Sequence, residues 1–277
     1  MKTTCQVCMH HCRLEPGQKG LCRARKNISG VIQCENYGRI TSLALDPIEK
    51  KPLKMFFPGS LILSVGSYGC NLKCPFCQNH EISMADPDCR NVPYLSPGSL
   101  KEKALALQKT GNIGLAFTYN EPLVGWEYLR DTASLTKKAG MKNVLVTNGT
   151  ASLHVLEEIL PFIDAMNIDL KGFREEYYQK LGGSLAVVKE FISRAAKDCH
   201  VELTTLIVPG ENDCTQELEE EAAWIASLAQ IQEIPLHITR FFPQYRMRDR
   251  AATDVAQVYR LAETARKHLK YVFTGNC

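Results

Sequence analysis

The sequence lacks the features of a membrane protein or a secreted protein. None of its apolar stretches approaches the roughly 20 residues that a membrane-spanning helix needs. The first residues, MKTTCQVCMHHC, hold no apolar core of the kind that a signal peptide has. We therefore expect no membrane partner and a cytoplasmic location.

An excess of charge of one sign is also missing. The net charge is only +3, and no run of lysine or arginine stands out. Because nucleic-acid-binding proteins neutralise phosphates with clustered basic side chains, nucleic acid is not an expected partner. We find no internal repeat and no low-complexity tract. The 277 residues, 45% of them apolar, are enough for one large α/β domain and a small appendage.

Cysteine, in contrast, is abundant, with twelve residues in the chain. In an oxidising compartment they would suggest disulfides, whereas in a reducing cytosol they more often indicate metal or redox chemistry. One group lies near the N-terminus and a second follows the first predicted strand. We expect Cys34, Cys89, Cys199 and Cys214 to be ordinary thiols.

The chain divides into two predicted regions. Residues 1–58 form a cysteine-rich segment with turn formers and short extended stretches near Val31–Cys34 and Arg39–Leu45, and "FPGS" marks a turn at its end. Residues 59–277 alternate between strand and helix patterns. The six strand candidates are residues 61–66, 113–119, 142–148, 165–171, 201–208 and 235–241.

Six strands that are each followed by a helix predict a parallel sheet with right-handed crossovers. Eight such units would close a barrel, so six predict an α/β fold of the partial (β/α)6, TIM-like type. In such folds the functional groups gather at the carboxyl ends of the strands. The second cysteine group lies at such an end.

This second group is Cys70, Cys74 and Cys77, in a C-x3-C-x2-C spacing within "GCNLKCPFCQNH". A disulfide would leave one thiol over, and zinc could take His80 as a fourth ligand. A 4Fe–4S cluster is the third interpretation, since thiolates are its usual ligands and three of them leave one iron open. The glycines Gly66 and Gly69 let the loop bend tightly.

The strand "MNIDLKG" is unusually polar. Side chains alternate between the faces of a strand, so Asn167, Asp169 and Lys171 share one face. A buried parallel strand is usually apolar on both faces. This polar face is therefore predicted to look into a cavity or onto a polar ligand.

The cysteine spacing, with Phe76 as the aromatic residue before the third cysteine, resembles the signature of the radical S-adenosylmethionine (SAM) superfamily. The resemblance implies that the open iron chelates the amino and carboxylate groups of SAM. It further implies reductive cleavage to a 5′-deoxyadenosyl radical, which abstracts hydrogen from a substrate, and a low-potential electron donor as partner.

The same resemblance assigns residues to SAM, Phe76 in the cysteine motif among them. Asn120 and Glu121 in "TYNEP" resemble residues that support its methionine amino group, although a helix start with Asn120 as N-cap and Pro122 at N1 is an alternative. Asn148 in "TNG" is a weaker candidate, because Asn-Gly is a turn former in any fold.

Two later strands supply further candidates. Lys171 could hold the cofactor carboxylate, with Asp169 orienting it or binding a cation, and a structural salt bridge is the alternative. Arg240 could meet the carboxylate bidentately or pair with Asp249 or Glu211. His237 is a candidate that could equally be a hydrogen-bonded core residue.

Nearly the whole chain resembles one subgroup, pyruvate formate-lyase activating enzyme-like proteins that include the radical SAM enzyme of the AmmeMemoRadiSam system. The stretches are "CQVCMHHCRLEPGQKGLCRAR", "DPIEKKPLKMFFPGS", "TYNEP", "VTNG", "NIDLKGF", "VPGEND" and "HITRFFP". Related activating enzymes have an aspartate where this chain has Val146, which weakens the case for a cation site.

The implied function is hydrogen abstraction by an oxidoreductase-type enzyme that could activate a glycyl-radical protein. A small-molecule substrate, or a substrate in a partner system, is one alternative, and a non-catalytic zinc-binding module is another.

The N-terminal group, Cys5, Cys8, Cys12 and Cys22, has the spacing C-x2-C-x3-C-x9-C. Four thiols could close a zinc site or hold a second iron–sulfur cluster, and His10 and His11 are alternative ligands. A second cluster would suit electron delivery, and zinc would suit the folding of a small segment. Thiols without a metal are the third interpretation.

Overall fold

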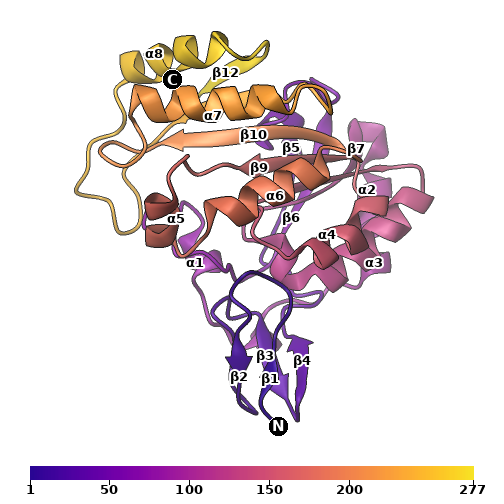
Figure 1. Ribbon diagram of the computed structural model, residues 1–277. Coiled ribbons are helices and arrows are strands. Elements are labelled where there is room, and N and C mark those ends of the chain that lie inside the picture. Colours follow the sequence, from indigo (N-terminus) through magenta and orange to yellow (C-terminus); the bar gives the residue numbers. More distant parts are fainter.

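An eight-stranded sheet forms the centre of the computed structural model, which describes residues 1–277 apart from the side chain at position 89 (Figure 1). The strand order is β12-β11-β10-β9-β8-β7-β6-β5. Neighbouring strands from β6 to β12 run parallel, and β5 pairs antiparallel with β6. The strands are β5 (Ser42–Pro47), β6 (Leu61–Gly66), β7 (Asn112–Phe117), β8 (Lys142–Thr147), β9 (Ala165–Asp169), β10 (His200–Ile207), β11 (Leu236–Arg240) and β12 (Val272–Gly275).

The partial (β/α) barrel is confirmed, and all six predicted strands are present. The sheet is larger than predicted because β12 extends one edge and β5 extends the other. β12 has only four residues, too few for a periodic pattern to stand out. β5 overlaps a predicted extended stretch, but its pairing with β6 is a tertiary contact that local sequence does not reveal.

Helices cover the outer face of the sheet, as Figure 1 shows for α3, α4, α6 and α7. Their core contacts are with strand residues such as Leu63, Leu115 and Leu145. Gly140 follows the end of α3 in the left-handed conformation that favours glycine, with a φ of +76°. The α-helices are α1 (His80–Ser83), α2 (Pro97–Ala106), α3 (Trp126–Lys138), α4 (Leu153–Ile159), α5 (Glu175–Leu181), α6 (Leu185–Ala195), α7 (Thr215–Ser227) and α8 (Val255–Arg266), and the 3₁₀ turns are η1 (Ile48–Lys50), η2 (Cys89–Asn91), η3 (Gln108–Thr110), η4 (Pro122–Gly125) and η5 (Leu160–Phe162).

The opposite, inner face is packed against the chain segment 48–56. Ile48 and Leu53 from this segment form an apolar cluster with one residue from each of the strands β6 to β9. These strand residues are Ile62, Ala116, Val144 and Ala165. Hydrogen bonds between strand side chains and the backbone of the segment hold it in place. Asn167 Nδ2 donates to the carbonyl oxygen of Pro52 over 2.9 Å. The fully buried Glu202 carboxylate accepts from the amides of Lys54 and Met55. The segment therefore fills the amino-terminal half of the inner face.

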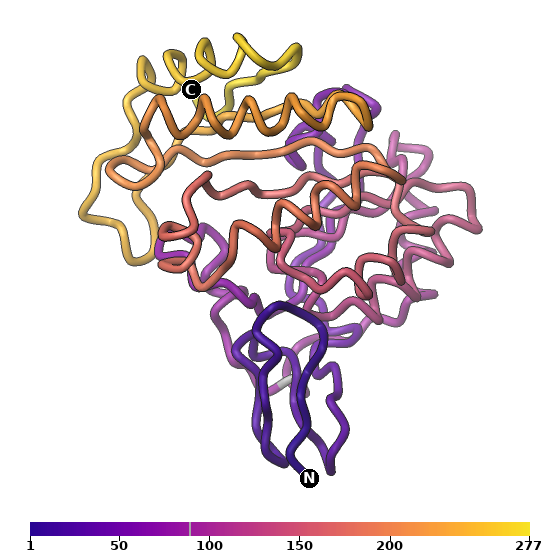
Figure 2. The backbone as a smooth tube through the Cα atoms, viewed as in Figure 1, coloured from indigo at the N-terminus to yellow at the C-terminus, as the bar shows by residue number. Residues whose placement is uncertain are grey.

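Residues 1–36, here called the N-terminal module, form two small hairpins outside the sheet. β1 (Thr3–Thr4) pairs with β2 (Arg13–Leu14), and β3 (Arg25–Ile28) pairs with β4 (Val31–Cys34). The module projects from one end of the sheet, in indigo in Figure 2. The predicted cysteine-rich region, residues 1–58, thus contains this module together with β5 and the inner segment, and the division at residue 58 stays a prediction.

None of the helices in the described residues of the chain has both the length and the hydrophobicity to span a bilayer.

Candidate active site

The cysteine loop leaves the sheet at the carboxyl end of β6. Gly69 makes the turn possible: its φ is +91°, and a Cβ there would lie 2.6 Å from the carbonyl oxygen of Cys22. Cys74 is buried, and Cys70 and Cys77 are half-buried. Each thiol lies within electrostatic range of the others, so the loop presents three thiols together.

The donor set suits an iron–sulfur cluster. Burial raises the pKa of the Cys70 thiol well above its usual value and that of Cys74 to about 11, although the nearby Lys171 ammonium opposes the rise at Cys74. Burial therefore disfavours free thiolates here, and a bound metal would supply the positive charge that stabilises them. Among the described side chains, no three His, Cys, Asp or Glu groups are spaced to hold one metal ion. In a 4Fe–4S cube each thiolate binds a different iron, so three such thiols fit this group.

His80, the fourth ligand of the zinc alternative, is engaged elsewhere. Its Nδ1 lies 3.2 Å from the carbonyl oxygen of Cys77, and its ring stacks on Tyr245 with centroids 4.4 Å apart.

Asn120, predicted to bind the cofactor, holds the start of the cysteine loop. Its Oδ1 accepts from the Ser67 amide over 3.0 Å, and its Nδ2 donates to the carbonyls of Tyr68 and Gly69. The alternative of Asn120 as N-cap is wrong. Glu121 caps η4 instead, because its carboxylate accepts from the Leu123 amide while the amide group of Asn120 is used by the loop.

Glu121 joins the ends of two neighbouring strands. Its buried carboxylate accepts from Thr147 Oγ1 over 2.7 Å, from the Asn148 amide over 2.8 Å and from the Leu123 amide over 3.1 Å. Burial raises the pKa of Glu121 to about 7, against the opposing effect of these donors. The carboxylate also lies within electrostatic range of Cys70.

Asn148 connects the end of β8 to the cysteine loop. Its Nδ2 donates to Asn71 Oδ1 over 2.9 Å and lies 3.8 Å from Cys70 Sγ. Its Oδ1 accepts from the amide and hydroxyl of Thr150. Asn148 thus contacts both a cluster thiol and the polar residue that follows it in the loop.

Asp169 and Lys171 form the predicted ion pair, with 2.7 Å between Oδ2 and Nζ. β9 ends at Asp169, so Lys171 stands just beyond the strand. Burial lowers the pKa of Lys171, but Asp169 and the Cys74 thiolate outweigh it, and the net direction is upward. The ammonium therefore stays charged at neutral pH and faces the cysteine loop.

The other predicted residues lie at the edge of this constellation. Phe76 is buried in an apolar cluster with Leu72, Tyr177 and Met247. His237 sits on the inner face with its Nε2 2.6 Å from Glu202 Oε2, the hydrogen-bonded core arrangement. Their binding to the cofactor stays a prediction.

Arg240 does not pair with Asp249 or Glu211, and those two alternatives are wrong. Its Nε donates to the carbonyl of Thr253 over 2.7 Å, and its guanidinium lies over the Phe242 ring. Glu211 is occupied by Lys180 and Arg250.

Sequence reasoning missed polar residues of the site region. Asn71 lies inside the cysteine motif, and its Nδ2 donates to Thr150 Oγ1 over 2.7 Å. Thr147 is the first residue of the "TNG" stretch, in which Asn148 alone is a predicted site residue. The position of Asn71 and Thr147 inside these motifs is the signal that could have found them.

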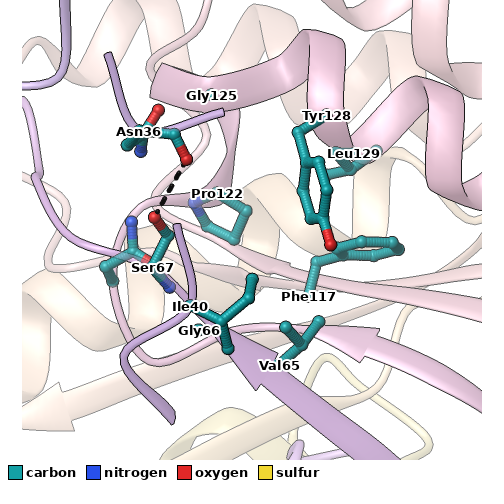
Figure 3. A pocket seen from close by; sticks show the side chains of 11 residues that line it. Asn36, Ile40, Val65, Gly66, Ser67, Phe117, Pro122, Gly125, Tyr128 and Leu129 are labelled. Carbon is teal, nitrogen blue, oxygen red and sulfur yellow. Dashed lines mark hydrogen bonds between the residues drawn. The ribbon is translucent and has the colours of Figure 1, made fainter. Parts of the chain in front are cut away.

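A small cavity lies behind Asn120, between the sheet, α3 and the N-terminal module (Figure 3). It measures about 30 Å³, and Ser67 on its wall contacts the carbonyl of Asn36. That volume holds a water molecule or two but no SAM. The cavity is therefore not the cofactor site.

Residues 64–225, which run from β6 to α7 and contain the cysteine loop, match the family described as the Radical SAM superfamily. The chain belongs to the radical SAM superfamily. This membership implies a 4Fe–4S cluster and SAM as cofactors, and it indicates that the chain is an enzyme.

Three curated proteins are similar in sequence. The uncharacterized protein MJ0808 of Methanocaldococcus jannaschii is 38% identical over 99% of this chain and 81% of its own length. The pyruvate formate-lyase 1-activating enzyme of Escherichia coli is 26% identical over 61% of this chain and 71% of its own length. The cysteine-type anaerobic sulfatase-maturating enzyme of Clostridium perfringens is 35% identical over 34% of this chain and 27% of its own length.

Two solved structures show the same fold. Streptococcus suis SuiB bound to S-adenosylmethionine has a TM-score of 0.59 at 14% identity, over 76% of this chain and 48% of that one. A domain of the pyruvate-formate lyase-activating enzyme from Bacteroides vulgatus has a TM-score of 0.51 at 18% identity, over 59% of this chain and 99% of that one.

Proposed function

We propose that this radical SAM enzyme abstracts a hydrogen atom from a protein substrate, in the manner of an activating enzyme for a glycyl-radical protein. The observation that carries the proposal is the trio of Cys70, Cys74 and Cys77 with Glu121 and Lys171 beside it at the carboxyl ends of the strands. When bound by these thiolates, a 4Fe–4S cluster supplies the electron that splits SAM and yields the 5′-deoxyadenosyl radical.

Glu121 and Lys171 suit the two charged groups of the methionine portion of SAM. A carboxylate has about four acceptor positions, and Glu121 uses three of them, so one is left for an ammonium group. An ammonium there would stabilise the ionised form of a carboxyl whose pKa is about 7. The charged Lys171 offers the matching contact for the carboxylate of SAM.

Two observations support a protein as substrate. Two relatives are named for proteins that they modify, pyruvate formate-lyase and a sulfatase. In addition, segment 48–56 fills the amino-terminal half of the inner face. A substrate group then reaches the site from the carboxyl edge of the sheet, where a loop of a larger protein can be presented.

The chemistry is tested by anaerobic reconstitution with iron and sulfide, followed by dithionite and SAM. We expect 5′-deoxyadenosine from the wild-type protein, and neither cluster nor product from Cys74→Ala. Cys214→Ala is the matched control, because Cys214 is exposed and lies outside the cysteine loop. A fully loaded cluster that forms no 5′-deoxyadenosine would overturn the proposal, as would zinc in place of iron at this loop.

The substrate class is tested with a glycyl-radical protein from the same organism. A glycyl radical signal in electron paramagnetic resonance, dependent on SAM and on Cys74, is the expected result. If 5′-deoxyadenosine forms readily, no protein radical appears and the hydrogen in 5′-deoxyadenosine comes from a small molecule, the protein substrate is wrong while the radical chemistry stands.

A further inference from the structure

The N-terminal module brings together four cysteines that the proposed reaction does not use. Cys5, Cys8 and Cys22 are buried and Cys12 is half-buried. The Cys5 amide donates to the Cys12 carbonyl over 2.9 Å. Cys5 lies within electrostatic range of Cys12 and Cys8, and Cys22 lies within range of both Cys5 and Cys8. Residues from two separate turns thus converge on one place.

Gly20 and Arg25 lie beside these thiols. Gly20 stands beside Cys12, and a Cβ at Gly20 would lie 3.7 Å from Cys12 Sγ. The buried guanidinium of Arg25 is near both Cys5 and Cys22 and places a positive charge beside them. Burial raises the pKa of the Cys5 and Cys22 thiols, and the positive charge of Arg25 opposes this rise.

The other candidate ligands of the module are engaged elsewhere. His10 Nε2 contacts the carbonyl of Asn71 at 2.8 Å, and His11 Nδ1 contacts Gln6 Oε1 at 3.1 Å. Cys34 Sγ contacts Asn36 Oδ1 at 3.0 Å. The four-cysteine set is the one that remains.

The module is too small to fold on apolar contacts alone. Its strands have two or four residues, and apart from cysteine its buried apolar side chains are Val7, Leu14 and Ala24. Segments of this size usually need a disulfide or a metal to be stable. In the oxygen-free setting that a radical SAM enzyme requires, thiolates that bind a metal meet this need better than disulfides.

From these contacts we infer that Cys5, Cys8, Cys12 and Cys22 bind a second metal centre, an iron–sulfur cluster, because no three His, Cys, Asp or Glu groups among the described side chains are spaced to hold one metal ion. Four thiolates are the complete ligand set of such a cluster. In contrast to the three-cysteine loop, this site has no ligand position left for a substrate, so its role is structural or electron-carrying.

The site is attached directly to the loop that carries the radical chemistry. Cys8 forms a β-bridge with Ala151, and the Ser152 amide donates to the carbonyl of Val7. Asn71 connects this part of the chain to the cysteine loop. Its side chain is hydrogen-bonded to Thr150 and Asn148, and it follows Cys70 in the sequence. A metal at the module would therefore hold Cys8 and, through Asn71, one side of the Cys70 turn.

The test begins with the variant Cys70→Ala/Cys74→Ala/Cys77→Ala, purified without oxygen. Since the radical cluster is absent from it, any metal that remains belongs to another site. We expect iron with an equal amount of acid-labile sulfide. This result supports the inference, whereas a folded triple variant without iron and sulfide overturns it.

Single changes on that background locate the site. Cys5→Ser and Cys12→Ser are expected to reduce the remaining metal to background, and Cys214→Ser, at an exposed position, is expected to leave it unchanged. Metal that survives all single changes at the four positions also overturns the inference. Circular dichroism shows whether each variant is folded.

If the triple variant does not fold, the wild-type protein gives the answer by X-ray absorption. More iron with sulfur ligands than one 4Fe–4S cluster holds supports the second centre. One 4Fe–4S cluster and no other metal in a well-loaded wild type overturns it. These readouts do not involve 5′-deoxyadenosine, so the inference and the proposed function can fail separately.

Discussion

The phenol of Tyr119 donates a hydrogen bond to Asp46 Oδ2 over 2.8 Å. Tyr119 has a φ of +73°, a left-handed conformation that is rare for a bulky residue. Lys51 Nζ lies 2.9 Å from the same oxygen and 4.8 Å from the centre of the Tyr119 ring. Residues from β5 and the inner segment thus hold the residue that precedes Asn120 and Glu121.

Tyr119→Phe should destabilise the protein although it keeps the ring. The change removes a hydrogen bond to a buried carboxylate, and such bonds contribute about 2 kcal/mol. We expect the free energy of unfolding in urea to fall by about this amount in anaerobic measurements. Tyr259→Phe is the control, because Tyr259 is 47% exposed. Equal losses in both variants would contradict a specific role of the Asp46 contact.

This contact illustrates what the sequence could and could not predict. Both ends of the strand at 61–66 are predicted correctly, because a short apolar run between turn formers is a local signal. The three cluster cysteines are predicted because their spacing is local too. Tyr119 and Asp46 are 73 positions apart, and no pattern within either stretch indicates that they meet.

The same reason explains the other differences. The cofactor role of Asn120 stays a prediction, and the bonds of its side-chain amide to Ser67, Tyr68 and Gly69 are contacts that its own stretch does not indicate. The filling of the inner face by residues 48–56 depends on the strand faces of the assembled sheet. Resemblance to a family predicts which motifs matter, whereas the partners of each side chain follow from packing across the fold.

Arg25→Lys should loosen the N-terminal module from the sheet. The Arg25 guanidinium donates to both oxygens of Glu127, at 2.6 and 2.5 Å, and its Nε donates to the Val124 carbonyl. Lysine cannot reproduce this planar, two-pronged contact. We expect a loss of about 2 kcal/mol in the free energy of unfolding, because the lysine ammonium keeps the charge but loses charge-assisted hydrogen bonds.

Limited proteolysis gives a second readout for this variant. Cleavage within residues 1–36 should become faster than in the wild type while the remainder resists. Arg13→Lys is the matched control, since Arg13 is exposed. If Arg25→Lys resists proteolysis and unfolding as well as the control does, the ion pair with Glu127 does not hold the module against the sheet.

Glu202→Gln should change how stability depends on pH. Burial favours the neutral carboxyl of Glu202, but hydrogen bonds from His200, His237 and two backbone amides outweigh it and lower its pKa from 4.5 to about 2. A lowered pKa contributes stability that is complete above pH 4.5 and is lost as the pH falls towards 2. The contribution is about 3 kcal/mol at neutral pH.

The measurement is the difference in unfolding free energy between wild type and Glu202→Gln across this pH range. We expect a large difference at pH 7 that shrinks as the pH falls from 4.5 towards 2. Glu176→Gln, at an exposed position of α5, should show no such trend. A constant difference would mean that the carboxylate charge of Glu202 is not what stabilises the inner face.

Lys171→Met should weaken the binding of SAM without loss of the cluster. The change removes the ammonium that faces the cysteine loop and keeps an apolar chain of similar length. A charge-assisted hydrogen bond contributes about 2 kcal/mol, so we expect the dissociation constant of SAM to rise roughly thirtyfold. Equilibrium dialysis measures the affinity, and iron analysis confirms the cluster. Lys180→Met is the control, because Lys180 is exposed and pairs with Glu211.

The structural alternative for Lys171 makes the opposite prediction. If the ammonium serves only its 2.7 Å ion pair with Asp169, then Lys171→Met and Asp169→Asn should lose similar amounts of unfolding free energy and both should bind SAM as the wild type does. If Lys171 holds the carboxylate of SAM, the two variants separate. Asp169→Asn keeps the ammonium and most of the affinity, because the positive charge at the cysteine loop is still there.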